Sequence, residues 1–212
     1  PDDLCERYGA DTLRLYEMFL GPLEQHKPWD TKGIEGTHRF LKKLWRLFTE
    51  NGISEEPATK SELKSLHKMI QKMEDDLDRF SFNTPVSNFM ICCNELTDLK
   101  CNKREILESF AIIISPYAPH IAEELWKNLG HVDSISQAQF PKFDASYLAE
   151  DNHSYPVSFN GKMRFKIELP TTLSKEEIEA EVMGHELAQK WLEGKQPKKV
   201  IIVPKKIVNV VI

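Results

Sequence analysis

The order of apolar and polar positions divides this sequence into a long helical part and a short part of mixed structure. Through the first three quarters, apolar side chains recur at steps of three and four residues, as on the buried face of a helix. Short connections between such segments predict a mostly α, antiparallel helical bundle. The expected helices begin near Gly9, at residue 33, after a capping box at Thr59, at Asn83, at residue 103 and at residue 120.

Several details of the bundle follow from the same pattern. Asp11 is placed to cap the first helix, and the apolar run 110–114 predicts burial on several sides. The stripes expected to be buried in the first three helices are Leu13, Tyr16, Phe19 and Leu20; Phe40, Leu41, Leu44, Trp45 and Phe48; and Leu63, Leu66, Met69, Ile70, Met73, Leu77 and Phe80.

The period changes to two in the last quarter, after a stretch over 130–155 that is expected to be irregular. Asn160-Gly161 supplies the positive φ angles of a type I′ turn between two strands. A second capping box at Ser174 opens a helix to about Glu193, and the apolar runs 200–203 and 207–212 predict two more strands. The tail is therefore predicted to be a small α+β module of ββ-α-ββ order. In the second strand, one face is expected to carry Met163, Phe165, Ile167 and Leu169, and the other Lys162, Arg164, Lys166 and Glu168.

Composition narrows the class of protein. Of the 212 residues, 41% are apolar and 29% charged, which is usual for a folded domain. No apolar run approaches the roughly 20 residues of a membrane span, and no secretory signal follows Pro1, so we expect no membrane partner. The missing initiator Met suggests a start inside a longer protein. Four cysteines without a C-x-x-C pair favour reduced, half-buried thiols in a cytoplasmic protein rather than disulfides or zinc.

Motifs of common catalytic sites are absent from the sequence. It has no P-loop, no G-x-G-x-x-G, no H-E-x-x-H and no G-x-S-x-G. His120 precedes Glu123 and Glu124, but packing and capping at a helix start explain it better than a metal or acid–base site. The acidic run 74–78 is read as a solvated helix face rather than a cation site. We therefore predict no catalytic residue, no metal site and no cofactor site in this chain.

Positive charge is unevenly distributed along the chain. The net charge is −5, yet residues 157–212 carry ten Lys and Arg against seven Asp and Glu. On the second helix, four cations follow i, i+3, i+4, i+7 spacing, and both phosphate contact and a solubilising face explain them equally: Arg39, Lys42, Lys43 and Arg46. If the last strands lie beside the hairpin, eight tail cations share one end of the module and favour polyanion binding: Lys162, Arg164, Lys166, Lys195, Lys198, Lys199, Lys205 and Lys206.

The run from Tyr8 to Glu24, YGADTLRLYEMFLGPLE, resembles the segment that follows the active-site lysine loop in bacterial-type leucyl-tRNA synthetases. The likeness continues, in the family's order and over nearly the whole chain, through 33–36, 39–46, 82–84, 116–126, 157–162 and 199–209. One position departs from the family: Phe165 stands where a glycine is usual. Its ring is expected either to fill the module's core or to alter a surface that faces RNA.

The resemblance implies the C-terminal part of an enzyme that joins leucine to tRNA(Leu) with ATP and magnesium. The catalytic and editing motifs of such enzymes are missing here, so the fragment alone is expected to be inactive. Its implied partners are tRNA(Leu) and the catalytic domain of the same polypeptide, in a cytoplasmic monomer. The implied division is the end of a stem-contact region over 1–30, an anticodon-binding-type bundle over 31–130, a connector over 131–155 and a tRNA-binding module over 156–212.

Two alternatives stay open on sequence alone. Ligases for isoleucine, valine or methionine also place a helical bundle after the catalytic core, although Thr12 and Asn160-Gly161-Lys162 favour leucine. A non-enzymatic helical scaffold with a protein-binding tail would need a large apolar stripe left over after the bundle has packed. No such stripe is apparent in the sequence.

Overall fold

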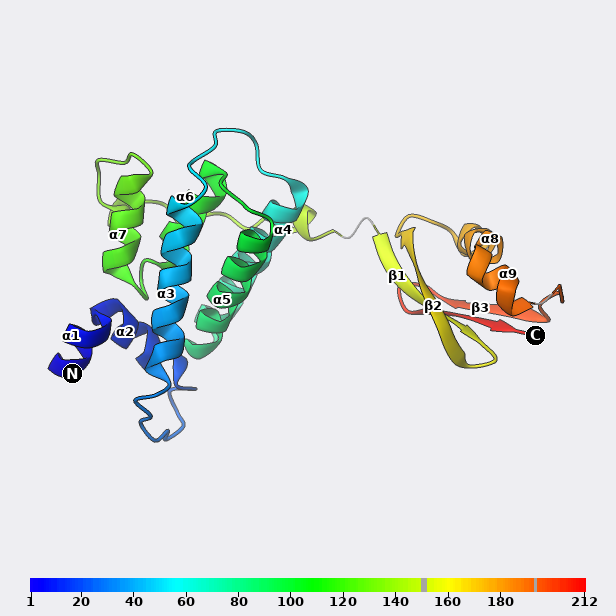
Figure 1. Ribbon diagram of the computed structural model, residues 1–212, viewed down its shortest axis with the longest axis horizontal. Coiled ribbons are helices and arrows are strands. Elements are labelled where there is room, and N and C mark those ends of the chain that lie inside the picture. The colour runs from blue at the N-terminus through cyan, green and yellow to red at the C-terminus, as the bar shows by residue number, and fades with distance from the viewer. Residues whose placement is uncertain (150–151, 193) are drawn as a thin grey trace. The chain divides into compact units, whose positions relative to one another are not determined.

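In a computed structural model the chain forms two compact units, Pro1–Leu148 and Ala149–Ile212 (Figure 1). The structure describes residues 1–149, 152–192 and 194–212. Across those ranges, every helix is too short or too polar to span a bilayer.

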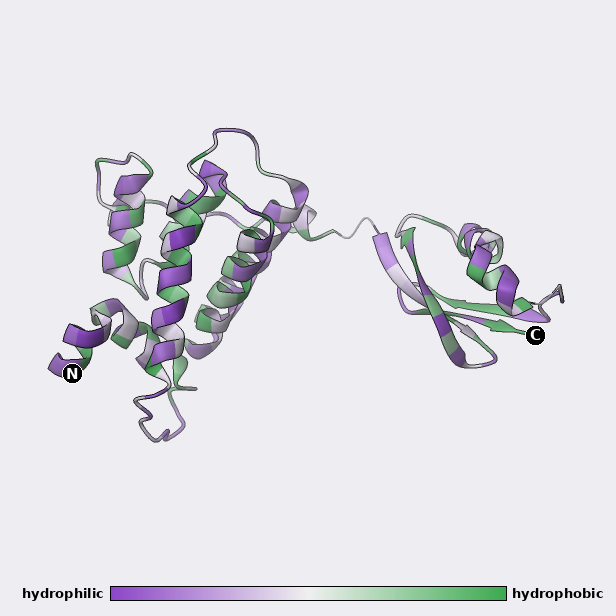
Figure 2. Ribbon diagram, viewed as in Figure 1, coloured by the Kyte–Doolittle hydropathy of each residue, from purple (hydrophilic) through white to green (hydrophobic). Residues whose placement is uncertain are grey.

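The first unit is the predicted helical bundle. Hydrophilic and hydrophobic residues alternate along its helices (Figure 2), as expected for helices with one buried face. The first helix was not predicted, because none of its residues is buried and it therefore carries no apolar stripe. The helices are α1 (Asp2–Tyr8), α2 (Ala10–Phe19), α3 (Ile34–Thr49), α4 (Lys60–Asp78), α5 (Asn83–Asp98), α6 (Arg104–Ile114) and α7 (Pro119–Asn128).

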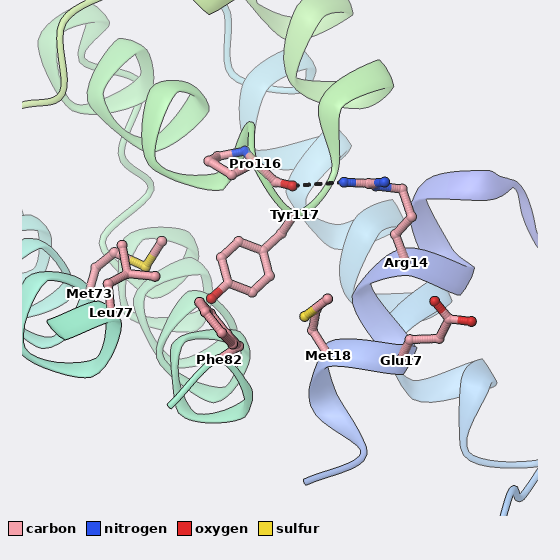
Figure 3. Close-up of a pocket in the computed structure, with 8 residues that line it drawn as sticks. All are labelled: Arg14, Glu17, Met18, Met73, Leu77, Phe82, Pro116 and Tyr117. Atoms are coloured by element: carbon pink, nitrogen blue, oxygen red, sulfur yellow. Dashed lines mark hydrogen bonds between the residues drawn. The ribbon is translucent and has the colours of Figure 1, made fainter. Parts of the chain in front are cut away.

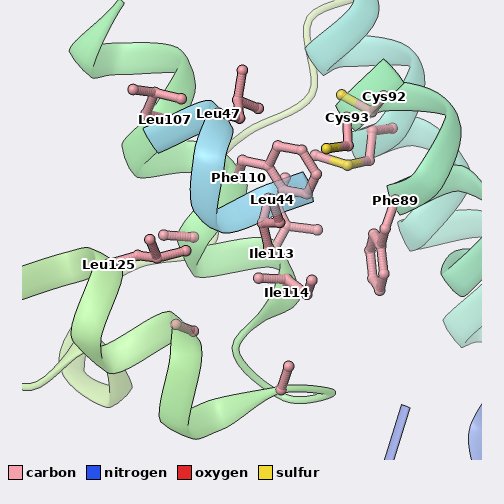
Figure 4. Packing of buried hydrophobic residues seen from close by; sticks show 14 of the residues in the cluster. Leu44, Leu47, Phe89, Cys92, Cys93, Leu107, Phe110, Ile113, Ile114 and Leu125 are labelled. Atoms are coloured by element: carbon pink, nitrogen blue, oxygen red, sulfur yellow. The ribbon is translucent and has the colours of Figure 1, made fainter. Parts of the chain in front are cut away.

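The core of the bundle is built around α6. Phe110, Ala111, Ile113 and Ile114 are fully buried, which confirms the burial predicted for this apolar run. They join side chains of α3 and α5 in one continuous cluster (Figure 4). The cluster also contains the thiols of Cys92, Cys93 and Cys101, all of them free. These three cysteines are buried, rather than half-buried as the sequence suggested.

Helix α4 begins as predicted and ends earlier than its stripe. The Thr59 hydroxyl accepts a hydrogen bond from the Glu62 N–H, and the Glu62 carboxylate accepts one from the Thr59 N–H at 2.7 Å. This reciprocal pair is a capping box. At the other end, Phe80 lies beyond the helix with φ +56° and is 72% exposed, so the prediction that it continues the buried stripe is wrong.

Asp11 caps a helix, but not its own. Helix α2 has Gly9 at its N-cap and no side-chain cap, whereas the Asp11 carboxylate accepts the Ile121 N–H at 2.7 Å in the first turn of α7. The same carboxylate lies 2.7 Å from Nδ1 of His120. Because Asp11 faces inward, the buried face of α2 differs from the predicted one. Phe19, which was expected to be buried, is 37% exposed. The buried residues of α2 are Asp11, Thr12, Leu15 and Tyr16.

The second unit is the predicted small α+β module. Its strands form a mixed sheet of order β2-β1-β4-β3, in which β1 and β4 are parallel and the outer pairs antiparallel. Two helices replace the single one expected, with a break at His185, and the expected helix end at Glu193 lies outside the described residues. The elements are β1 (Asn152–Phe159), β2 (Lys162–Pro170), α8 (Lys175–Gly184), α9 (Glu186–Leu192), β3 (Lys199–Val203) and β4 (Ile207–Val211).

Strand β1 begins inside the stretch that was expected to be irregular. Its parallel pairing with β4 starts only at Val157, one residue after Pro156. Proline has no N–H to donate, so Pro156 is tolerated where β1 has a neighbour on one side only. A proline is unusual inside a strand, so the sequence did not predict that β1 begins before Pro156.

The β1–β2 hairpin contains the predicted turn and an unpredicted β-bulge. Asn160 and Gly161 have φ angles of +49° and +80°, which confirms the type of turn expected there. Val157 pairs with Phe165 but Ser158 pairs with Met163, so Arg164 is an extra residue in β2. The alternation of faces therefore changes at Arg164.

Because of this bulge, the side chains predicted for each face of β2 were partly wrong. Arg164 lies on the same side as Phe165, because its guanidinium stacks on Trp191 of α9. Met163 pairs with Ser158 and so points to the opposite side, 59% exposed. Phe165 itself is buried and stacks on His185 with 4.9 Å between ring centroids. The ring at this unusual position therefore fills the module's core.

Candidate nucleic-acid interface

The predicted basic side chains of α3 lie in one groove. Arg39, Lys42, Lys43 and Arg46 line a hollow of about 410 Å³, together with Thr97 near the end of α5. The α3 spacing puts the four cations within one side of the helix, because each residue turns the helix by about 100°. We call these four residues the α3 cluster.

Little negative charge compensates the α3 cluster. Lys43 donates a 2.6 Å hydrogen bond to Oδ1 of Asn94, a neutral partner that fixes the ammonium without cancelling its charge. Arg46 approaches Glu50 at 3.8 Å, but both side chains are more than 60% exposed, so this ion pair is weak. Within the described ranges, Arg39 and Lys42 have no ion pair. The groove is therefore positive and open to an anion.

Trp45 flanks the α3 cluster and was assigned to the wrong face. The sequence suggested that its ring was part of the core, but it is 38% exposed. On a helical projection it lies next to Lys42, at the border of the basic side. A half-exposed indole beside cations can contact the face of a base or ribose. Tryptophan next to a run of Lys and Arg is the signal that could have found it.

A second basic stripe, on α4, escaped the sequence analysis although its i, i+4 spacing is regular. Lys68 pairs with Glu95 at 3.8 Å, and Lys72 pairs with Asp76 at 2.6 Å. The Asp76 side chain is 4% exposed, so the acidic run 74–78 is not the fully solvated face expected. The other two members of this α4 stripe, Lys60 and Lys64, also have interactions within the protein. This stripe serves the fold more than it offers charge to an anion.

The tail cations do not share one end of the module, contrary to the sequence-based expectation. Strands β3 and β4 are antiparallel, so Lys198 and Lys199 lie at one end of this hairpin and Lys205 and Lys206 in the turn at the other. The Lys205 N–H donates to the hydroxyl of Tyr155, which is near the start of β1. In the described part of the chain, none of the eight tail cations forms an ion pair with a carboxylate.

The bundle also has an apolar hollow of about 260 Å³ (Figure 3). Met73, Leu77, Phe82 and Tyr117 line it, with Arg14 and others from α2 at its rim. The Tyr117 hydroxyl is buried without a hydrogen-bond partner among the described residues, and burial, followed by the charge of Asp76, raises its pKa to about 12.

Some large apolar side chains at helix ends and in loops of the first unit are exposed. These side chains are Met18, Phe19, Leu23, Trp29 and Phe80.

The sequence resemblance implies ATP and magnesium for a longer enzyme, and the described residues bear on the metal part of that expectation. No three His, Cys, Asp or Glu side chains in those ranges are grouped so that they could hold a metal ion. Burial raises the pKa of the Cys92 and Cys101 thiols to about 12, so these thiols stay protonated at neutral pH.

Comparison with known proteins gives one consistent relationship. Residues 60–180 match the model of the anticodon-binding domain of tRNA ligases. The chain is 63% identical to the leucine–tRNA ligase of Flavobacterium johnsoniae and 59% identical to that of Cytophaga hutchinsonii. All of the chain is covered, but only 22% and 23% of those two proteins, so the chain spans less than a quarter of the curated relatives it matches.

A solved structure extends the relationship to the fold. The whole chain superposes on a leucyl-tRNA synthetase of Agrobacterium radiobacter, in a ternary complex with tRNA and LeuAMS, with a TM-score of 0.74 and 26% identity. The match covers 30% of that chain. With more than half of its length matched by the family model, the chain belongs to the anticodon-binding domain family of tRNA ligases.

Proposed function

We propose that this chain is the tRNA-docking C-terminal region of a leucine–tRNA ligase, which attaches leucine to tRNA(Leu) with ATP. The observation that carries the proposal is the α3 cluster, four cations in one groove with a single weak carboxylate partner. Phosphates of a folded RNA are the anions that such a groove suits, because contacts to phosphate and ribose read shape without reading bases. The relatives that cover the whole chain are leucine enzymes, which favours leucine over isoleucine, valine or methionine.

The apolar hollow suggests a second role, contact with the rest of the same polypeptide. The relatives are more than four times as long as this chain, and their catalytic part would need a surface on which to dock. Met18, which lines the hollow, is exposed, and so are its neighbour in α2, Phe19, and Phe80 after α4. Exposed apolar patches of this kind are typical of docking surfaces. The same reasoning leaves ATP, magnesium and leucine to that catalytic part, in a cytoplasmic enzyme.

A binding experiment with three RNAs tests the proposal. The chain is titrated with leucine tRNA, with a tRNA for another amino acid, and with a leucine tRNA that lacks its long variable arm. We expect a micromolar or weaker dissociation constant for leucine tRNA, a binding free energy of about −8 kcal/mol or less in magnitude, and weaker binding of the other two. Equal affinity for all three RNAs would remove the leucine assignment.

A second experiment tests the prediction that this region alone does not activate leucine. Leucine and ATP added to the chain alone should give no leucyl-adenylate, measured as exchange of pyrophosphate into ATP. Formation of adenylate would contradict the proposal that this region only docks tRNA.

A further inference from the structure

The two faces of the sheet in the second unit differ in what covers them. Helices α8 and α9 pack on one face through Ile178, Val182, Ala188 and Leu192, which join the core with Val157 of β1. We call this the helix face. The opposite face is the outer face, and no described element of this unit packs on it (Figure 1).

The register of the strands shows which side chains the outer face carries. Met163, Ser158, Asn209 and Ile201 follow one another across the four strands in one row. Met163 is 59% exposed and Ile201 42%. In the neighbouring row, Val203 pairs with Ile207 and is 39% exposed. The outer face is therefore partly apolar, with Ser158 and Asn209 between the exposed Met163 and Ile201, whereas such a face is usually polar throughout.

Positive charge surrounds the outer face. Lys166 pairs with Pro156 and Lys199 with Val211, which puts both lysines on this side of the sheet. Lys205 and Lys206 lie in the turn that joins the two strands nearest its other edge. Glu168 is the one described carboxylate on the outer-facing positions of the strands.

The helix face has the opposite character. Helices α8 and α9 carry five glutamates and two lysines, so an approaching phosphate meets negative charge there. Arg164, which the bulge turns to this side, already has its guanidinium 4.0 Å from the centre of the Trp191 ring. Lys162 pairs with Phe159, a residue of the core, and so lies at the edge of the helix face.

We propose that the outer face is the RNA-binding surface of this module: bases or riboses of a folded RNA cover the Met163–Ile201 row, and phosphates contact Lys166 and Lys199. Charge complementarity selects RNA as the occupant, because a partly apolar surface with a basic rim matches the faces of bases and the anionic backbone that surrounds them. The inference rests on the proposed function and deepens it. It divides the predicted tail cations: Lys162 and Arg164 are excluded, although sequence spacing grouped them with Lys166.

The bulge supplies a matched pair of variants. K166E and K162E make the same charge reversal at two exposed positions of one strand, on opposite faces. Binding of the chain to leucine tRNA is measured by fluorescence anisotropy, with circular dichroism as the check of fold. We expect K166E to weaken binding about fourfold and to lower the salt slope by about one phosphate contact, a change of roughly 0.9. K162E should stay within about twofold of the parent chain. A larger effect of K162E overturns the inference and leaves the proposed function standing.

A cross-linking experiment identifies the occupant directly. A photo-reactive benzoylphenylalanine in place of Met163 should cross-link to the tRNA, and the same residue in place of Trp191 on the helix face should not. Cross-linking at position 163 to a second copy of the chain, or to the catalytic part in a full-length ligase, overturns the inference. If K166E and the photo-probe at 163 have no effect on tRNA while the chain still binds it through α3, the outer face is excluded. A chain that binds no tRNA at all overturns both proposals.

Discussion

The bundle presents two basic helix faces, and only one of them is available to an anion. On α3, Lys42 and Arg39 lie beside a groove without a described carboxylate partner, and Lys43 is held by an amide oxygen. On α4, Lys72 contacts the nearly buried carboxylate of Asp76, and Lys68 lies near Glu95. In the sequence, both stripes are cations repeated at helical spacing. The difference shows that the position of the acids, more than the number of cations, decides where phosphate can bind.

The largest effect is expected from reversing the charge of α3. The triple variant R39E/K42E/R46E should bind leucine tRNA on the order of 30-fold more weakly at fixed salt, because three phosphate contacts would become repulsions. All three side chains are exposed, so the helix content should not change. Anisotropy titration measures the affinity.

The matched control for α3 is K68E on α4, a reversal at a side chain that is 52% exposed. Because Lys68 lies in a groove that also contains the carboxylates of Glu95 and Asp98, we expect less than a twofold change in RNA affinity. A loss comparable to that of a single α3 reversal would show that the comparison between the two helices is wrong.

A stability measurement tests whether Lys72 of α4 stabilises the fold. Lys72→Met leaves Asp76, whose other carboxylate oxygen accepts from the Thr84 hydroxyl, without its cation. We expect the free energy of unfolding to fall by about 1 kcal/mol, since the buried acceptor keeps one partner. RNA affinity should be unchanged. Urea denaturation reports the first effect; unaltered stability would contradict the structural role.

The buried face of α4 predicts a pH dependence. Nδ1 of His67 accepts the Asp144 N–H at 3.1 Å and the ring stacks on Tyr147, so this histidine holds the segment after residue 142 against the bundle. Burial lowers the pKa of His67 below its usual 6.5, although the charge of Asp144 opposes this. The neutral form is therefore favoured in the folded state.

The sign of the effect follows from that lowered pKa. The stability that His67 contributes is fully present above pH 6.5 and is lost as the pH falls from there through the folded-state pKa. Unfolding curves at pH 7.5 and 5.0 should differ more in the parent chain than in His67→Gln, which cannot titrate. Equal differences in the two proteins would exclude His67 as the source.

The smallest effect concerns the residue that holds Lys43. Asn94→Leu removes the acceptor of the 2.6 Å hydrogen bond but keeps the lysine's charge. We expect RNA affinity to fall about twofold, because the ammonium is less ordered, with the salt slope unchanged since the same number of phosphates is neutralised. A changed slope would mean that Asn94 affects more than the position of Lys43.

Features of the structure that depend on local interactions could be predicted from the sequence. The Thr59 capping box and the Asn160-Gly161 turn were both predictable, because each needs only a few consecutive residues. The burial of residues 110–114 was also predictable, since these five consecutive residues of α6 are all apolar.

Interactions between distant residues were not predictable. Asp11 was correctly identified as a capping residue, but its partners are more than 100 residues away, and no local pattern shows which helix it caps. The bulge at Arg164 depends on how β1 pairs with β2, and it moved half of the predicted basic face to the other side of the sheet. For the candidate site, spacing found the cations of α3, whereas the distinction from α4 required the positions of Glu95 and Asp76.

The central claim is that the α3 cluster docks RNA through its phosphates, and the salt dependence of binding tests it most directly. The dissociation constant for leucine tRNA is measured for the parent chain and for R39E/K42E/R46E over a series of salt concentrations. The account predicts that the slope of log affinity against log salt becomes shallower by about 2.7 in the variant, roughly 0.9 for each of three lost contacts if the contacted stem behaves like a duplex. Parallel lines for the two proteins would contradict it.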